Sequence, residues 1–234
     1  MKSEKITIYA TFNKHLSSFN AKETIFAIVK PNIMAEKDRL HLYIIAGCNG
    51  AGKTTASFTV LPEMLNCREF VNADEIAKGL SPFNPEGVAI QAGRLMIDRI
   101  IHLLKDGETF AFETTLATRS YVNLIQRAQK RGYFVTLLFF SLSSPEQAVA
   151  RVAKRVSLGG HNIPNDVILR RYEAGLQNFF ELYTPICDYW TLYDNSNIPG
   201  EKIAYGWKNE RLNIVDKEKF ERFHSLYAKS EDHE

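Results

Sequence analysis

From residue 41 onward the chain alternates short apolar runs with longer stretches in which apolar residues recur at helical spacing. The runs predict strands at residues 41–47, 69–73, 110–115, 133–142 and 189–196. The intervening stretches predict helices at residues 53–65, 88–107, 120–131, 146–158 and 165–183. Several runs are almost wholly apolar, which requires a sheet covered on both faces, and helical crossovers between them imply parallel strands. The pattern therefore predicts a three-layer α/β fold with a mostly parallel sheet.

The two ends of the chain do not follow this alternation. Residues 1–40, with a short strand at 6–9 and a helix at 21–29, predict an N-terminal extension to a core spanning 41–200. Residues 201–234 predict a hairpin and a charged helix appended to that core. The extension is compatible with an accessory folding element and also with a segment that inhibits the functional site in cis.

Composition narrows the class of protein further. The chain has 234 residues, of which 45% are hydrophobic, and a net charge of only +2, so it can bury a sizeable core and has no bulk field that attracts nucleic acid or membrane. It begins without an apolar leader and has no run long enough to cross a bilayer. The three widely spaced cysteines favour reduced thiols. We expect a soluble, cytoplasmic protein that binds neither membranes nor nucleic acid.

The strongest local signal is GCNGAGKT at Gly47–Thr54, which matches the phosphate-binding loop G-x-x-x-x-G-K-[ST] between a strand and a helix. Its backbone N–H groups would converge on the phosphates of ATP, Lys53 would bridge the β- and γ-phosphates, and Thr54 would bind Mg²⁺. Cys48 fits a filler position better than a nucleophile. The expected nucleotide contacts are Gly47, Cys48, Asn49, Gly50, Ala51, Gly52, Lys53, Thr54 and Thr55.

Two carboxylates follow predicted strands and should lie at the edge of the sheet where ligands bind. Asp74 follows the second strand, where it suits either a base that accepts the proton of an attacking hydroxyl or an N-cap of the helix containing Glu75. Glu113 ends FAFETT, flanked by Thr114 and Thr115, and a carboxylate after so apolar a run needs a partner. We expect it to contact substrate or metal.

Four arginines lie on either side of a Gly159–Gly160 break: Arg151, Arg155, Arg170 and Arg171. Arg151 and Arg155 are one helical turn apart and share a face. A cationic lid hinged at the glycines would neutralise a triphosphate and exclude water. The same arginines are also compatible with a solvated basic helix. We favour the lid.

Together these motifs resemble the zeta-toxin-like P-loop kinases. The resemblance covers about Leu42 to Ser196 and is carried by GCNGAGKTT, VNADEIAKGLSPFNPE, FAFETT and RVAKRVSLGGHNIP running into RRYEAGLQN. It implies a nucleotide-kinase-like P-loop fold with an arginine-bearing lid. It also implies ATP- and Mg²⁺-dependent phosphorylation of a sugar hydroxyl, which in well-known members belongs to UDP-N-acetylglucosamine, and an antitoxin protein as a further partner.

The resemblance also implies roles for individual residues. Lys53 and Thr54 match the nucleotide and metal positions, Asp74 the catalytic base, and Glu113 the substrate-binding carboxylate. Arg155 and Arg171 match the lid arginines that act in catalysis. Thr114 and Arg119 are further candidates for substrate binding.

The chain departs from those toxins after Glu113, where it reads TTLATR rather than a Gly-Thr-Gly-Arg run, so that Arg119 comes later than the expected arginine. In this respect it more closely resembles a shorter bacterial subgroup of predicted ATPases or kinases. We therefore expect a kinase for a sugar or nucleotide-sugar hydroxyl. The alternatives are a nucleotide-dependent ATPase switch that binds a partner, and a nucleotide or polynucleotide kinase.

Overall fold

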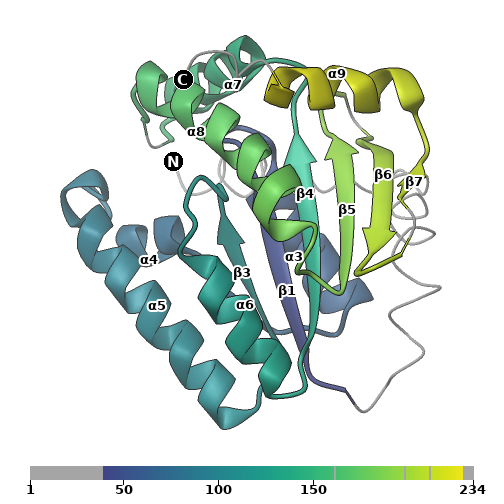
Figure 1. Ribbon diagram of the computed structural model, residues 1–234. Helices are drawn as coiled ribbons and strands as arrows, with labels where there is room; N and C mark the ends of the chain where they lie inside the picture. The colour runs from purple at the N-terminus through teal and green to yellow at the C-terminus, as the bar shows by residue number, and fades with distance from the viewer. Residues whose placement is uncertain (1–38, 161, 198, 211, 229–234) are drawn as a thin grey trace.

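The described residues form a seven-stranded sheet with helices on both faces (Figure 1). The computed structural model describes residues 39–160, 162–197, 199–210 and 212–228. In spatial order the strands are β2 (Glu69–Val71), β3 (Phe110–Thr114), β1 (His41–Gly47), β4 (Phe134–Ser141), β5 (Tyr189–Asp194), β6 (Glu201–Trp207) and β7 (Asn213–Ile214). The first five are parallel; β6 is antiparallel to β5, and β7 is antiparallel to β6.

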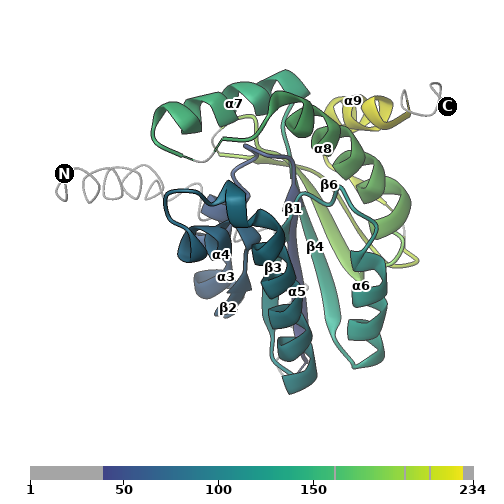
Figure 2. The ribbon, with the colours of Figure 1, turned by 90° about the vertical axis from the view of Figure 1, so that its left-hand side faces the viewer.

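The helices form the outer two layers. They are α3 (Lys53–Met64), α4 (Ala73–Leu80), α5 (Ala89–Asp106), α6 (Tyr121–Lys130), α7 (Pro145–Ser157), α8 (Asn165–Asn178) and α9 (Lys217–Ala228), with a 3₁₀ turn η1 (Glu86–Val88) and a π turn η2 (Phe179–Tyr183). Figure 2 shows α3 against one face of the sheet and α6 and α8 against the other. None of these described helices has the length and apolar run of a membrane span.

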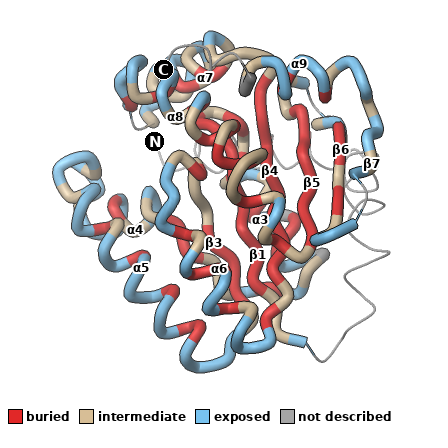
Figure 3. Tube along the Cα trace, in the orientation of Figure 1, coloured by how far each residue is buried: buried red, intermediate tan, exposed pale blue. Residues whose placement is uncertain are grey.

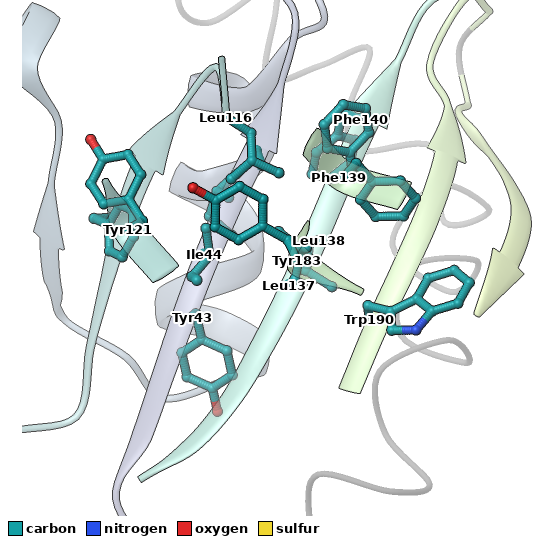
Figure 4. Packing of buried hydrophobic residues seen from close by; sticks show 14 of the residues in the cluster. Tyr43, Ile44, Leu116, Tyr121, Leu137, Leu138, Phe139, Phe140, Tyr183 and Trp190 are labelled. Carbon is teal, nitrogen blue, oxygen red and sulfur yellow. The ribbon is translucent and has the colours of Figure 1, made fainter. Parts of the chain in front are cut away.

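The centre of the sheet is the most buried part of the molecule (Figure 3). Apart from their first residues, β1 and β4 are buried throughout, because helices cover both of their faces. Figure 4 shows side chains of β1, β4 and β5 in this core, including Ile44, Leu137 and Trp190. The ring centroids of Phe139 and Phe179 are 4.6 Å apart, and this contact packs η2 against β4. This rigid centre fixes the loops that leave its carboxyl edge.

The three-layer fold with a mostly parallel sheet is confirmed, and three local predictions need correction. The strand expected at 69–73 ends at Val71, because Asn72 caps α4 and Ala73 already belongs to that helix. The helix expected at 165–183 changes to a π turn after Asn178. The strand at 189–196 ends at Asp194, and the hairpin expected after it extends the same sheet as β6 and β7.

The expected N-terminal elements at 6–9 and 21–29 lie outside the described residues. The division of the chain at residues 40 and 200 stays a prediction. The structure adds one fact about it: β6 hydrogen-bonds along the whole length of β5, and residue pairs run from Tyr189↔Trp207 to Asp194↔Glu201. The hairpin is thus continuous with the sheet that carries the site.

Candidate functional site

The loop between β1 and α3 passes so close to β4 that its first position requires glycine. Gly47 has φ +137°, and a β-carbon there would lie 1.9 Å from the carbonyl oxygen of Phe140. At the other end, Gly52 has φ +80° in the left-handed region and leads directly into α3. The glycines therefore permit the backbone to wrap around the N-terminus of a helix, where N–H groups and the helix dipole favour phosphate.

Residues from two other elements hold this loop in place. The side-chain amide of Asn195, just after β5, donates to the carbonyl of Ala51 at 2.6 Å. Arg151 of α7 donates to the carbonyl of Ser196 at 2.7 Å and, more weakly, to that of Gly50 at 3.5 Å. The guanidinium of Arg151 thus bridges the phosphate loop and the segment after β5. Arg151 therefore supports the backbone of the loop in addition to placing a positive charge beside it.

Lys53 and Thr54, which end the loop, both contact the carboxylate of Glu113 on the neighbouring strand β3. Thr54 donates its hydroxyl to Glu113 Oε2 at 2.8 Å, and the Lys53 ammonium lies 3.7 Å from Glu113 Oε1. Lys53 also donates to the carbonyl of Cys48 at 3.0 Å. These contacts place Glu113 beside the groups expected to bind the β- and γ-phosphates and the metal.

Asp74 lies in the first turn of α4, at the carboxyl end of β2. It is not the N-cap of that helix: Asn72 is, and its Oδ1 accepts from the backbone N–H groups of Asp74 and Glu75. The capping alternative is therefore wrong for Asp74. Asp74 is exposed, and it lines both of the cavities described below. This arrangement leaves the carboxylate accessible to a bound hydroxyl compound.

Two cavities meet at the end of the phosphate loop. The first, of about 540 Å³, runs along the loop and beneath the end of α7, and includes Lys154, Arg155 and Gly160 in its lining. The second, of about 490 Å³, lies between the N-terminus of α4, the loop after β3 and α8. Both are lined by Asn49, Lys53, Asp74 and Glu113. We name them the donor cavity and the acceptor cavity, because each has the size of a small-molecule site and they share one junction.

The arginines divide between the two cavities. Arg151 and Arg155 line the donor cavity, whereas Arg170 and Arg171 of α8 line the acceptor cavity. Arg119 is exposed and is not among the residues lining either cavity. Both cavities therefore present cations to a ligand, which suits anionic compounds on both sides of the junction. The catalytic and binding roles of these residues stay predictions.

The acceptor cavity is partly walled by the loop after β3, which α8 holds in a strained conformation. Leu116 is fully buried with φ +60°, a left-handed conformation that is costly for leucine. Its carbonyl accepts from the side chain of Asn178 at 2.8 Å, and its N–H donates to Thr114. Thr114 and Thr115 line the cavity. Thr114 therefore shapes this loop as well as lining the cavity.

Cys48 has the environment of a filler residue. Its thiol is buried, and this burial raises its pKa to about 11, although the nearby Lys53 and Arg151 charges act in the opposite direction. The thiol is therefore protonated at neutral pH and is a poor nucleophile. All three cysteines are buried and free of disulfides, as expected.

The sequence predicts that Asp74 and Glu113 lie at one edge of the sheet, and both line the two cavities there, but it does not reveal the side chains that hold them. Asn72, which contacts both α4 and Glu113, was not identified, although an Asn before Ala-Asp-Glu is typical of an N-cap. Leu116 and Asn178 were also missed. No local signal marks them, because their contact joins segments far apart in the chain.

Magnesium would find oxygen donors at the junction in Thr54, Glu113 and Asp74, which are the hard ligands it prefers. The described residues contain no group of three or more metal-binding side chains of the His, Cys, Asp or Glu type. This donor set fits a metal that takes one or two ligands from the protein and completes its shell with nucleotide phosphates and water.

A sequence model of the zeta toxin family matches residues 29–197. An uncharacterized protein of Haemophilus influenzae is 32% identical over 127 residues, which are 54% of this chain and 88% of that relative. Among solved structures, the AvrRxo1-ORF1:ORF2 complex with ATP superposes with a TM-score of 0.65 at 17% identity and covers 88% of this chain and 69% of its own. A structure from the PezAT toxin–antitoxin system of Streptococcus pneumoniae has a TM-score of 0.55 at 15% identity. The match covers 91% of this chain and 97% of that one.

Proposed function

Because the chain belongs to the zeta toxin family, we propose that it transfers the γ-phosphoryl group of ATP to a hydroxyl of an anionic sugar or nucleotide-sugar. Family and fold make it a P-loop phosphotransferase that uses ATP; the acceptor is the proposed part. The observation that carries the proposal is the junction of two cavities at Lys53, Asp74 and Glu113. Phosphoryl transfer needs a donor site and an acceptor site that meet at one reacting centre.

In the proposed reaction the acceptor oxygen forms a bond to the γ-phosphorus, the bond from that phosphorus to the β,γ-bridging oxygen breaks, and ADP leaves with the electron pair. Asp74 accepts the proton of the acceptor hydroxyl. Lys53 and the lid arginine Arg155 stabilise the negative charge of the transferring group, and Arg171 does so from the acceptor side. Bound Mg²⁺, held at Thr54, would supply further charge neutralisation on the phosphates.

The anionic character of the acceptor follows from the lining of its cavity. Arg170 and Arg171 face the cavity from α8, and planar guanidinium groups bind phosphate oxygens through paired hydrogen bonds. Tyr121 and Met96 provide apolar surface in the same cavity. A nucleotide-sugar such as UDP-N-acetylglucosamine combines phosphates, rings and free hydroxyls, which is the combination that such a cavity suits.

The test is a transfer assay with γ-labelled ATP, Mg²⁺ and a panel of neutral sugars, sugar phosphates and nucleotide-sugars. We expect label on an anionic member of the panel. Asp74→Asn should lower the rate by roughly 10²- to 10⁴-fold, the usual contribution of a general base, and leave ATP affinity unchanged. Glu75→Gln on the same helix is the matched control. Release of free phosphate alone, at equal rates in wild type and Asp74→Asn, would support the ATPase-switch alternative.

Family membership also supports toxicity and an antitoxin partner, which we include in the proposal. If the activity is toxic, expression of the wild-type chain should arrest bacterial growth, and Asp74→Asn should abolish the arrest at equal protein level. Growth arrest that persists in Asp74→Asn would separate toxicity from phosphoryl transfer.

A further inference from the structure

Asn49, the third residue of the phosphate loop, has a buried side chain without a hydrogen-bond partner. The residue is only 6% exposed, and its Oδ1 accepts no hydrogen bond in the described structure. The two other asparagines that are buried in the described ranges are both bonded. Asn72 donates to Glu113, and Asn178 donates to a backbone carbonyl. Since buried polar groups nearly always have a partner, an exception beside a cavity indicates that a ligand supplies it.

The conformation of the loop does not account for an asparagine at this position. Asparagine is common where a residue other than glycine has positive φ, as Asn66 and Asn209 do in this chain. Asn49 is not among the described residues with positive φ. Its side chain also forms no hydrogen bond with its own loop, in which the Ala51 N–H donates instead to the carbonyl of Cys48. The amide is therefore available to a bound molecule.

Asn49 lies where the donor cavity and the acceptor cavity meet. Four of the described residues line both cavities, namely Asn49, Lys53, Asp74 and Glu113. The ammonium of Lys53 can only donate hydrogen bonds, and ionised carboxylates can only accept them. A carboxamide does both, through its NH₂ group and its oxygen. Among these four residues, Asn49 alone can therefore bond at once to a phosphate oxygen, which accepts, and to a hydroxyl, which donates.

We propose that Asn49 bridges the two substrates at this junction. Its Nδ2 donates to an oxygen of the γ-phosphoryl group, and its Oδ1 accepts from a hydroxyl of the acceptor that neighbours the reacting hydroxyl. The acceptor is then a compound with hydroxyls on adjacent carbons, as in a sugar ring. The inference rests on the proposed function and narrows its acceptor class. Asp74 still takes the proton of the reacting hydroxyl, and Asn49 neither gains nor loses a proton.

A bound acceptor can set the orientation of the Asn49 amide. Oδ1 is buried in this structure, but no hydrogen bond from the described residues holds it there. The last side-chain torsion of asparagine is broad and roughly two-fold, so the amide turns at little cost. Its two ends can therefore follow the two substrates.

The bridge should matter most while the phosphoryl group is being transferred. In the transition state the negative charge is spread over the three oxygens of that group. A donor that meets these oxygens stabilises the transition state and has no contact with ADP, which lacks the γ-phosphoryl group. Loss of the Asn49 amide should therefore separate the affinity for ADP from the affinity for a mimic of the transition state.

The first measurement needs no acceptor. Calorimetric titration compares ADP with ADP plus aluminium fluoride and Mg²⁺, which together mimic the transferring phosphoryl group. Asn49→Ala should bind ADP like the wild type and the aluminium fluoride complex about 10- to 100-fold more weakly, the contribution of one hydrogen bond to a charged group. Asn195→Ala, which removes the support of the Ala51 carbonyl, should weaken both ligands by the same factor. Asn123→Ala, at an exposed position of α6, should change neither affinity.

The second measurement tests the acceptor side of the bridge in the transfer assay. The phosphorylated acceptor is compared with its deoxy analogue, which lacks the hydroxyl next to the reacting one. With wild-type protein the analogue should have a kcat/KM lower by about 3- to 10-fold, the contribution of one hydrogen bond. Asn49→Ala should distinguish the two acceptors little, because the partner of that hydroxyl is already absent. Asn49→Asp retains the accepting oxygen and should still distinguish them, although transfer is slower.

Three results would overturn the proposal. They are an unchanged affinity of folded Asn49→Ala for the aluminium fluoride complex, an equal loss of affinity for ADP and for that complex, and the same preference between the two acceptors in Asn49→Ala and the wild type. Thermal unfolding of each variant checks that it folds. Absence of any phosphorylated acceptor would count against the kinase proposal instead, and the aluminium fluoride comparison would still decide whether Asn49 contacts the transferring group.

Discussion

Substitution of Arg151 by methionine tests whether this arginine supports the phosphate loop rather than acting as part of a mobile lid. The change retains the apolar stem and removes the guanidinium. Arg151 donates at 2.7 Å to the carbonyl of Ser196, and its second contact, at 3.5 Å to Gly50, is too long to add much. The substitution should therefore lower the free energy of unfolding by the contribution of one charge-assisted hydrogen bond in a half-buried position.

A hydrogen bond to a charged group contributes about 1.5 to 3 kcal/mol, and partial exposure of Arg151 favours the lower half of that range. A loss of about 1.5 to 2 kcal/mol in a chain of this size corresponds to a fall in Tm of roughly 3 to 8 °C. If the whole loss falls on the loop, ATP affinity decreases by about 10- to 30-fold, since about 1.4 kcal/mol is a factor of ten. Salt should change this result little, because the acceptor is a carbonyl and not a charge.

The assay is thermal unfolding followed by circular dichroism, together with titration of a fluorescent ATP analogue. Arg127→Met, which removes an exposed arginine from α6 on another part of the molecule, is the matched control and should leave both quantities unchanged. An Arg151→Met protein with wild-type Tm and wild-type nucleotide affinity, but with reduced turnover, would refute the structural role and would assign Arg151 to the lid.

Two further predictions follow from the same loop. Gly47→Ala should abolish ATP binding and lower Tm, because the added β-carbon would lie 1.9 Å from the carbonyl oxygen of Phe140; an alanine variant that binds ATP normally in the titration would contradict the close approach of the two strands. Burial raises the pKa of Cys48 from 9.0 to about 11, so the folded thiol retains its proton where the unfolded thiol loses it. Its contribution to stability is complete below pH 9 and is lost as pH rises towards 11. Cys48→Ala should therefore show a smaller fall in Tm between these pH values than the wild type, and an equal fall would contradict the assignment.

The sheet was predictable from sequence because its information is local. The runs that form β1 and β4 are apolar at nearly every position, and glycines or turns mark their ends. The end of β2 was not predictable in the same way. Asn72 and Ala73 follow an apolar run, and only the hydrogen bonds that Asn72 Oδ1 accepts from the first turn of α4 show that the strand has already ended.

The candidate site was predictable to the level of the sheet edge. Asp74 and Glu113 follow strands, and parallel topology brings such positions together. The sequence could not show that Glu113 accepts the Thr54 hydroxyl, because that contact depends on the neighbouring positions of β1 and β3 in the sheet. In the same way, Arg151 and Arg155 share a helix face in the sequence pattern. Only the position of Ser196 after β5 shows which of them supports the loop.

Transfer of label from γ-labelled ATP to a nucleotide-sugar or sugar phosphate, compared between the wild type and Asp74→Asn, decides whether the chain is a kinase with Asp74 as its base. We expect a labelled product with wild-type protein, a rate lower by roughly 10²- to 10⁴-fold with Asp74→Asn, and equal ATP affinity in the two proteins. A product formed at the same rate by both proteins would show that Asp74, at the junction of the two cavities, has no part in the reaction.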